Sequence, residues 1–184
     1  MAPGSGVTVA ADSARWAVRG ARITVDRPVV LGVLNLTPDS FSDGGSYPDA
    51  GAAMARAERL VHDGADLVDV GGESTRPGAG PVEAAEEWSR IGPVVEALAL
   101  RGIPVSVDTM KAEVARRAAD AGAVALNDVS GLRFDPGLAD VAAGAGMGLI
   151  MMHMRGMPRT MQRDVTYDDL LGEVATGARA QSLD

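Results

Sequence analysis

The stretch Val30-Leu-Gly-Val-Leu-Asn35-Leu-Thr-Pro-Asp-Ser-Phe-Ser-Asp-Gly-Gly45 decides the fold, because an apolar run leads directly into a loop crowded with polar residues and glycine. A second run has the same pattern and ends in a carboxylate, two hydroxyls and an arginine: Leu67-Val-Asp-Val-Gly71-Gly-Glu-Ser-Thr75-Arg-Pro-Gly78. Each apolar run is typical of a buried strand. Two such strand ends in one sheet predict a functional site.

Similar apolar runs without polar alternation recur along the chain, as is typical of a parallel sheet covered on both faces. They predict strands at residues 29–34, 67–70, 104–107, 123–126 and 148–152. The segments between have helical periodicity, and helices are predicted around 53–61, within 81–100, at 111–121, after Pro136 and at 167–180. In the second helix, Pro81 suits the first turn, Gly102 suits the end, and Pro93 is expected to kink or divide it. A hairpin is predicted before the first strand, with its turn at Arg19-Gly20.

Alternating strands and helices imply right-handed parallel crossovers, hence an α/β fold that is either a doubly wound sheet or a (β/α)₈ TIM barrel. Every predicted strand leads into a polar group, namely Asn35, Asp69, Asp108, Asn127 with Asp128, and His153. This favours the barrel, in which all strand ends converge on one mouth. Five strands make the barrel incomplete, with residues 1–27 forming an extension with a hairpin and 28–184 a partial barrel. We therefore expect a fragment, or a chain that borrows the missing part by oligomerising.

The composition limits the classes of function. The 184 residues are 46% hydrophobic, carry a net charge of −8 and include no cysteine. The hydrophobic content excludes a disordered chain, the negative charge argues against a nucleic-acid partner, and disulfides and thiolate zinc sites are impossible. No apolar run approaches the roughly 20 residues of a membrane span, and residues 1–9 do not resemble a secretory signal. We therefore expect a cytoplasmic location without a membrane partner.

The first two loops offer candidates for anion and metal binding. The Asn35 carboxamide could complete the shell of Mg²⁺ beside waters and substrate phosphates, or Asn35 could be an ordinary turn residue. Arg76 could grip phosphate oxygens with help from Ser74 and Thr75, or it could be a surface residue paired with Glu73.

The later strand ends offer candidates for binding a heterocycle. Asp108 could accept two N–H bonds from a ring, act as a general base, or cap the helix that starts near Lys111. Asn127 supplies both a donor and an acceptor to a ring edge, although it and Asp128 could equally form a turn. His153 lies among methionines, where a structural role is the favoured interpretation. The motifs of common hydrolases and zinc enzymes are absent from the sequence.

Five motifs together, in this order and spacing, resemble dihydropteroate synthase of folate biosynthesis: Asn35-Leu-Thr-Pro-Asp-Ser-Phe-Ser-Asp-Gly-Gly45, Asp69-Val-Gly-Gly-Glu-Ser-Thr-Arg-Pro-Gly78, Val105-Ser-Val-Asp-Thr109, Asn127-Asp-Val-Ser-Gly131 and Met152-His-Met. The resemblance implies a (β/α)₈ enzyme that joins the pterin carbon of dihydropterin pyrophosphate to the amine of 4-aminobenzoate. Pyrophosphate leaves with the help of Mg²⁺. The resemblance also implies a homodimer at full length.

The resemblance implies a role for each matching residue. Asn35 corresponds to the Mg²⁺ and pyrophosphate contact, Thr75 to a substrate contact, and Asp108 and Asn127 to pterin contacts. The resemblance also places Phe41 and Pro77 around 4-aminobenzoate. If pyrophosphate leaves before the amine attacks, Arg76 would neutralise the leaving group and Asp108 would stabilise the positive charge on the pterin methylene. The family's later Asp, Lys and Arg-x-His residues have no counterpart in this sequence.

Three alternatives stay open at this point. The nearest rival enzyme is a methyltransferase that acts on methyltetrahydrofolate and shares the pterin-binding barrel. A rival of another class is a catalytically incompetent half-barrel that binds pterin or a partner chain. The third is a truncated reading frame without independent function.

Overall fold

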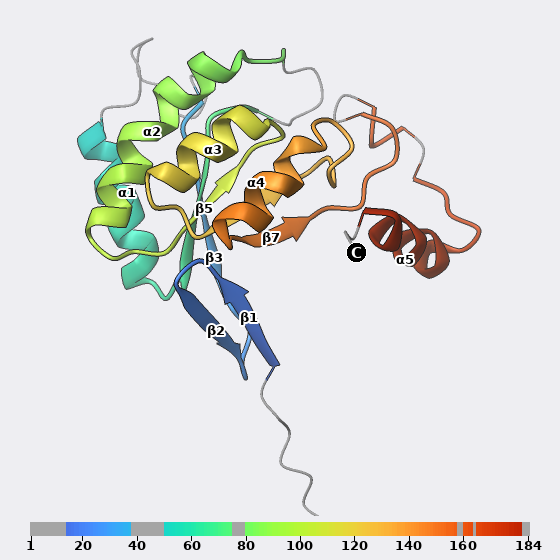
Figure 1. Cartoon of the computed structure of the whole chain (residues 1–184), viewed down its shortest axis with the longest axis horizontal. Helices are drawn as coiled ribbons and strands as arrows, with labels where there is room; N and C mark the ends of the chain where they lie inside the picture. The colour runs from blue at the N-terminus through green and yellow to red at the C-terminus, as the bar shows by residue number, and fades with distance from the viewer. Residues whose placement is uncertain (1–13, 38–49, 75–79, 158–159, 164, 182–184) are drawn as a thin grey trace, which may run out of the picture.

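The computed structural model describes residues 14–37, 50–74, 80–157, 160–163 and 165–181 of the chain (Figure 1). Its centre is a five-stranded parallel sheet in which the strands lie in the order of the sequence: β3 (Leu31–Asn35), β4 (Leu67–Gly71), β5 (Val105–Asp108), β6 (Ala125–Asp128) and β7 (Gly148–Met151). A doubly wound sheet would reverse its strand order at a switch point, whereas a barrel does not. The topology thus confirms the α/β prediction and fits an incomplete barrel.

Helices connect the strands and cover one face of the sheet (Figure 1). They are α1 (Ala50–His62), α2 (Ala84–Leu100), α3 (Ala112–Asp120) and α4 (Gly137–Ala145), with α5 (Leu170–Gln181) following β7. The core lies between this helical layer and the outward-facing side chains of the strands, among them Leu34, Val70, Val107 and Leu126, which are fully buried. The strand residues that alternate with these face the inner side of the sheet, so a site on that side must be built from them.

The second predicted helix differs from the structure in two ways. Helix α2 begins at Ala84 with Glu83 as its N-cap, so the prediction that Pro81 lies in the first turn was wrong. Pro93 does not divide the helix, which runs unbroken to Leu100. Pro93 has no N–H that could donate to the carbonyl group one turn earlier in the helix. Because Pro93 is exposed, water can solvate that carbonyl group instead. The predicted end at Gly102 is confirmed, because this residue has a φ of +71° directly after the helix.

Strand β3 corrects the prediction of runs without alternation. Gly32 and Leu34 are buried, but Val33 is 50% exposed and Asn35 is exposed, so the strand alternates between two faces. The reason is that β3 is an edge strand of the described sheet and only its outer face packs against α1. In an edge strand with one covered face, burial alternates with a period of two residues. In a central strand both faces are covered, so this alternation is absent.

The N-terminal hairpin closes the end of the sheet opposite the strand C-termini. Strands β1 (Ala14–Val18) and β2 (Ala21–Val25) pair around Arg19-Gly20 as predicted, and Gly20 adopts a φ of +70° in the turn. The side chain of Trp16 lies against Gly148, the first residue of β7. A side chain at residue 148 would occupy the space that the indole takes.

We predict that Gly148→Ala lowers the free energy of unfolding by about 1–3 kcal/mol, as overpacking usually does. The new Cβ would lie 2.6 Å from Cζ2 of Trp16, so the hairpin would have to shift. The matched control is Gly144→Ala in α4, where nothing apart from the adjoining residues and the backbone of the helix itself lies within 4 Å of the new Cβ. This control should gain about 0.5–1 kcal/mol from helix propensity. Urea denaturation measures both, and equal effects of the two changes would contradict the packing account.

Candidate functional site

The register of the parallel strands brings the predicted site residues into one row. Residues opposite each other in adjacent parallel strands face the same side of the sheet. Pairing joins Asn35 to Gly71, Gly71 to Asp108, Asp108 to Asn127 and Asn127 to Ile150. A second row lies one layer deeper and contains Val33, Asp69, Ser106, Ala125 and Gly148. The structure therefore brings Asn35, Asp108 and Asn127 together at the C-terminal ends of the strands.

Gly71 keeps an open space between two of these side chains. A Cβ atom at this residue would lie 3.4 Å from Oδ2 of Asp108 and 3.5 Å from Oδ1 of Asn35. The two oxygens thus approach the same point from opposite sides. Asn35 is an exposed residue.

Asp108 has an unusual protonation equilibrium. Burial, together with the negative charges of Asp69, Glu87, Asp128 and Glu73, raises the pKa of Asp108 from 3.8 to about 7. Near neutral pH the side chain is therefore divided between the acid and the carboxylate. A carboxyl group in this state can donate one hydrogen bond as well as accept others.

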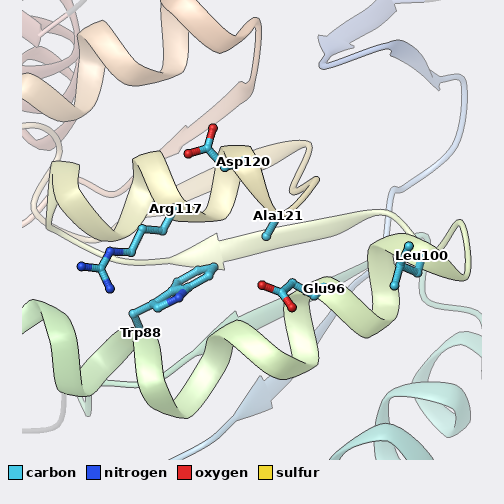
Figure 2. A pocket seen from close by; sticks show the side chains of 6 residues that line it. All are labelled: Trp88, Glu96, Leu100, Arg117, Asp120 and Ala121. Atoms are coloured by element: carbon cyan, nitrogen blue, oxygen red, sulfur yellow. The ribbon is translucent and has the colours of Figure 1, made fainter.

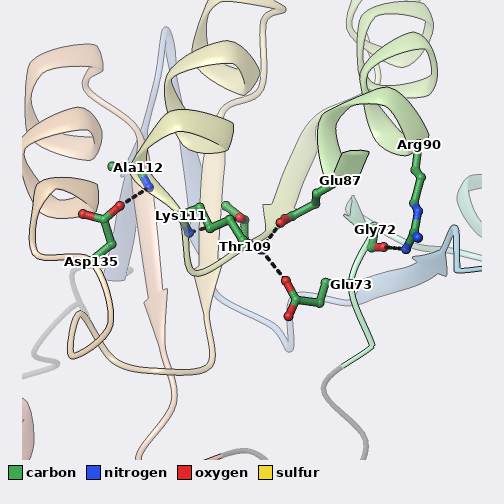
Figure 3. Close-up of polar contacts among 8 residues, drawn as sticks. All are labelled: Gly72, Glu73, Glu87, Arg90, Thr109, Lys111, Ala112 and Asp135. Carbon is green, nitrogen blue, oxygen red and sulfur yellow. Dashed lines mark hydrogen bonds and ion pairs between the residues drawn. The ribbon is translucent and has the colours of Figure 1, made fainter. Parts of the chain in front are cut away.

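Asp108 does not cap helix α3, which was the alternative role suggested by the sequence. The N–H of Lys111 donates to Oγ1 of Thr109 at 3.2 Å, and the N–H of Ala112 donates to Oδ2 of Asp135 at 2.8 Å (Figure 3). These two side chains satisfy the first amides of α3. The carboxyl group of Asp108 is thereby left to the mouth of the sheet.

Asn127 and Asp128, which the sequence left as two possible turn residues, have different functions. Asp128 is buried, and its carboxylate accepts the N–H groups of Ser130 at 2.7 Å and Leu132 at 2.6 Å. Asp128 therefore builds the turn after β6. Asn127 instead donates from Nδ2 to Oδ2 of Asp69 at 3.0 Å, within the sheet. Of the two residues, Asn127 is the one that lies in the row of Asp108.

Two carboxylates flank Lys111 beside this row (Figure 3). The ammonium group contacts Oε2 of Glu87 at 2.5 Å and also pairs with Glu73. The Glu87 side chain is only 1% exposed, and this burial raises its pKa while Lys111 opposes the shift. Since Glu73 pairs with Lys111, the suggested surface pair of Glu73 with Arg76 is not needed to satisfy it.

Sequence reasoning missed this cluster, although a signal was present. Glu87 lies four residues before Ile91, on the apolar face of α2, and a carboxylate on such a face needs a cation nearby. Lys111 was noted only as the start of a helix. The remaining predicted site residues, Phe41, Thr75, Arg76 and Pro77, lie outside the described residues, and their roles stay predictions.

His153 has a partner that agrees with the structural interpretation. Its Nε2 lies 3.2 Å from Oε1 of Glu173 in α5, and the Arg155 guanidinium also pairs with Glu173. Arg155 lies 4.0 Å over the ring of Tyr167. These contacts fasten α5 to the segment that follows β7.

A surface pocket lies elsewhere, between α2 and α3 (Figure 2). It is lined by Trp88, Glu96, Leu100, Arg117, Asp120 and Ala121. These residues belong to the outer helical layer, so the pocket is separate from the strand ends.

In the described ranges, no group of three or more His, Cys, Asp or Glu residues could hold a metal ion, and no helix is long and apolar enough to cross a membrane.

Comparison with known proteins places this geometry in a family. The profile of the family described as pterin binding enzyme matches residues 31–184, which include the whole parallel sheet. The chain belongs to the pterin-binding enzyme family. One relative in this family is the dihydropteroate synthase of Neisseria meningitidis serogroup B, which is 43% identical over 171 residues, covering 92% of this chain and 60% of the relative.

Solved structures of pterin-binding enzymes agree with the fold. Dihydropteroate synthase of Xanthomonas albilineans with 4-aminobenzoic acid has a TM-score of 0.80 and 45% identity, covering 92% of this chain and 60% of that one. The Burkholderia cenocepacia enzyme complexed with 7,8-dihydropteroate has a TM-score of 0.78 and 42% identity, covering 92% and 57%. This chain thus spans well under two thirds of the length of each of these relatives.

We predict that Lys111→Met lowers the free energy of unfolding by about 3 kcal/mol or more, because it leaves Glu87 buried without a cation. The control is Arg117→Met, which removes a pair with Glu113 that is exposed on both sides and should change stability by less than about 0.5 kcal/mol. Urea denaturation measures both. Adding Glu87→Gln to Lys111→Met should recover part of the loss, and a loss that stays unchanged would contradict this account.

We also predict a pH dependence that Asp108 causes. Its folded-state pKa of about 7 is above the ordinary value of 3.8, so the folded state holds a proton that the unfolded state has released between these values. The stability that Asp108 contributes is complete below about pH 4 and is lost as the pH rises through about 7. Asp108→Asn does not titrate, so its free energy of unfolding should fall less than that of the wild type between about pH 5 and about pH 8. If the free energies of unfolding of the two proteins change equally with pH, the pKa of Asp108 is not raised.

Proposed function

We propose that this chain carries the pterin-binding part of a dihydropteroate synthase. The reaction joins the methylene carbon of a dihydropterin pyrophosphate to the amine of 4-aminobenzoate and releases pyrophosphate. The observation that carries the proposal is the placement of Asp108 beside Asn127 at the strand ends, within the part of the chain that matches the family. The Burkholderia and Xanthomonas relatives, whose structures hold 7,8-dihydropteroate and 4-aminobenzoic acid, support the choice of this product and of 4-aminobenzoate as a substrate.

Asp108 and Asn127 suit recognition of a pterin ring. The ring is a flat heterocycle whose edge alternates N–H donors with acceptor atoms. Asn127 offers a donor and an acceptor, and Asp108 with a pKa of about 7 offers either form of its carboxyl group. Thr75 adds a hydroxyl contact to a substrate in this proposal.

The electrostatics also suit the bond that breaks. Departure of pyrophosphate leaves positive charge on the pterin methylene, and the cluster of carboxylates around Asp108 stabilises positive charge. The leaving group needs the opposite environment, which Arg76 supplies. Phe41 and Pro77 shape the place of 4-aminobenzoate and exclude water that would otherwise react in place of the amine.

Asn35 fits a role in holding Mg²⁺. Asn35 is an exposed residue whose Oδ1 lies beside Gly71, and Mg²⁺ in phosphate sites is held by one or two protein oxygens together with waters and substrate phosphates. When bound, the ion would supply positive charge to the departing pyrophosphate. Its removal should therefore affect turnover more than pterin binding.

Other parts of the proposal concern the whole protein. We infer a homodimer, a cytoplasmic location, and the absence of nucleic-acid and membrane partners. The net charge of −8 supports the exclusion of nucleic acid. These inferences are independent of the pterin site.

The proposal is tested with the native product of the gene, incubated with dihydropterin pyrophosphate, 4-aminobenzoate and Mg²⁺. Dihydropteroate should form, chelation of Mg²⁺ should slow its formation, and Asp108→Ala or Asn127→Ala should reduce kcat/KM by about 100-fold or more. Glu113→Gln is the control, because Glu113 is exposed on the outer face of α3 and should leave the rate unchanged.

Two other results would replace the proposal. Methyl transfer from methyltetrahydrofolate to a thiol or corrinoid, without dihydropteroate formation, would identify the rival methyltransferase. Pterin binding measured by calorimetry without either product would identify a binding half-barrel.

A further inference from the structure

Asp69 is a buried carboxylate for which the fold itself offers little compensation. It is 4% exposed and lies in the deeper row of the inner face, opposite Ser106. Its Oδ1 has no hydrogen-bond partner within the described ranges, and burial raises its pKa. Burying such a group without full pairing is unfavourable. A residue that only stabilised the fold would gain more from an apolar side chain at this position.

Two side chains, Asn127 and Ser106, act on the Asp69 carboxyl group as hydrogen-bond partners and oppose the effect of burial on its pKa. Of these two residues, Asn127 belongs to the site. Nδ2 of Asn127 donates to Oδ2 of Asp69 at 3.0 Å. Asn127 lies one layer nearer the mouth, in the same row as Asp108, and is half-buried. The bond therefore connects the buried interior of the sheet to the ligand-facing row.

The bond also fixes which way the Asn127 amide points. A carboxylate only accepts hydrogen bonds, so Asn127 must turn its NH₂ group to Asp69 and its carbonyl oxygen elsewhere. The reversed amide would place two oxygens in contact and would exchange donor for acceptor at the mouth. An amide held in one orientation before the ligand arrives loses less entropy on binding.

We propose that Asp69 is a positioning residue that orients the Asn127 carboxamide, so that Asn127 presents one defined donor–acceptor pattern to the edge of a pterin ring. This inference rests on the proposed function, because it names pterin as the ligand. It assigns to Asp69 an action through Asn127 and no contact with the reacting atoms. Truncating Asp69 should therefore weaken pterin binding and leave the chemical step nearly unchanged.

Two variants separate orientation from charge. Asp69→Leu keeps the approximate volume and removes the acceptor, whereas Asp69→Asn keeps an acceptor oxygen that Asn127 can still bind. Both remove the negative charge that acts on Asp108, so that effect is common to the pair. In the native protein, Asp69→Leu should raise the Kd for 6-hydroxymethylpterin by about 10-fold or more, as expected for loss of a hydrogen bond to a charged group. Asp69→Asn should stay within about 3-fold of the wild type, because its amide can still adopt the accepting orientation.

A double-mutant cycle identifies the route of the effect. If Asp69 acts through Asn127, then Asp69→Leu combined with Asn127→Ala should bind pterin no more weakly than Asn127→Ala alone. In steady-state assays, Asp69→Leu should raise the KM for the pterin substrate with kcat changed less than about 3-fold, because it removes binding common to the ground and transition states. The KM for 4-aminobenzoate should not change.

The outcomes are distinct. A wild-type protein that does not bind 6-hydroxymethylpterin would refute the proposed function itself. With wild-type binding intact, additive losses in the cycle, or equal losses in Asp69→Leu and Asp69→Asn, would overturn the positioning role alone. Circular dichroism checks folding, and if Asp69→Leu does not fold, Asp69→Ala enters the same cycle because it removes the acceptor without a misfitting side chain.

Discussion

Parallel pairing of β3 to β7 is the constraint on which the site depends. Because all five strands run in the same direction, their C-terminal residues reach the same edge of the sheet, and the register fixes which of them share a row. Asn35, Asp108 and Asn127 are up to 92 positions apart in the chain, yet they belong to one row. A shift of one residue in any strand would turn its site residue to the helical face. Packing of the outer face against the helices excludes that shift.

Burial then determines the chemistry of the row. Four carboxylates act on Asp108, and the one lysine in their cluster, Lys111, is engaged by Glu73 and Glu87. Negative charges this close raise one another's pKa values unless cations or donors compensate. The result is an acidic mouth in which Asp108 carries a proton part of the time. Such a mouth attracts a heterocycle with N–H donors and favours positive charge that develops beside it.

The sequence predicted the elements better than their ends. The strands, the helices, the hairpin turn at Arg19-Gly20 and the row of polar strand ends followed from periodicity and from glycine positions. Pro81 and Pro93 misled the prediction. Helix α2 begins only at Ala84, so Pro81 precedes it. The helix continues through Pro93 because this residue lies on an exposed side. The pairs of Asp69 with Asn127 and of Lys111 with Glu87 join distant segments, and only the strand register and helix packing bring them together.

The same electrostatics divide the proposed site into two parts. In the proposed function, Asp108 and Asn127 would suit a neutral ring and a developing cation, but they would repel the pyrophosphate to which that ring is attached. Lys111 cannot compensate, because two carboxylates already hold its charge. In the proposed function, the phosphate end would therefore meet its positive charge away from Asp108, at Arg76 and at a cation held by Asn35, which lies in the row on the other side of Gly71. The negative charge near Asp108 and a cation at Asn35 would lie on opposite sides of Gly71. This separation would draw the pyrophosphate away from the methylene as the bond breaks.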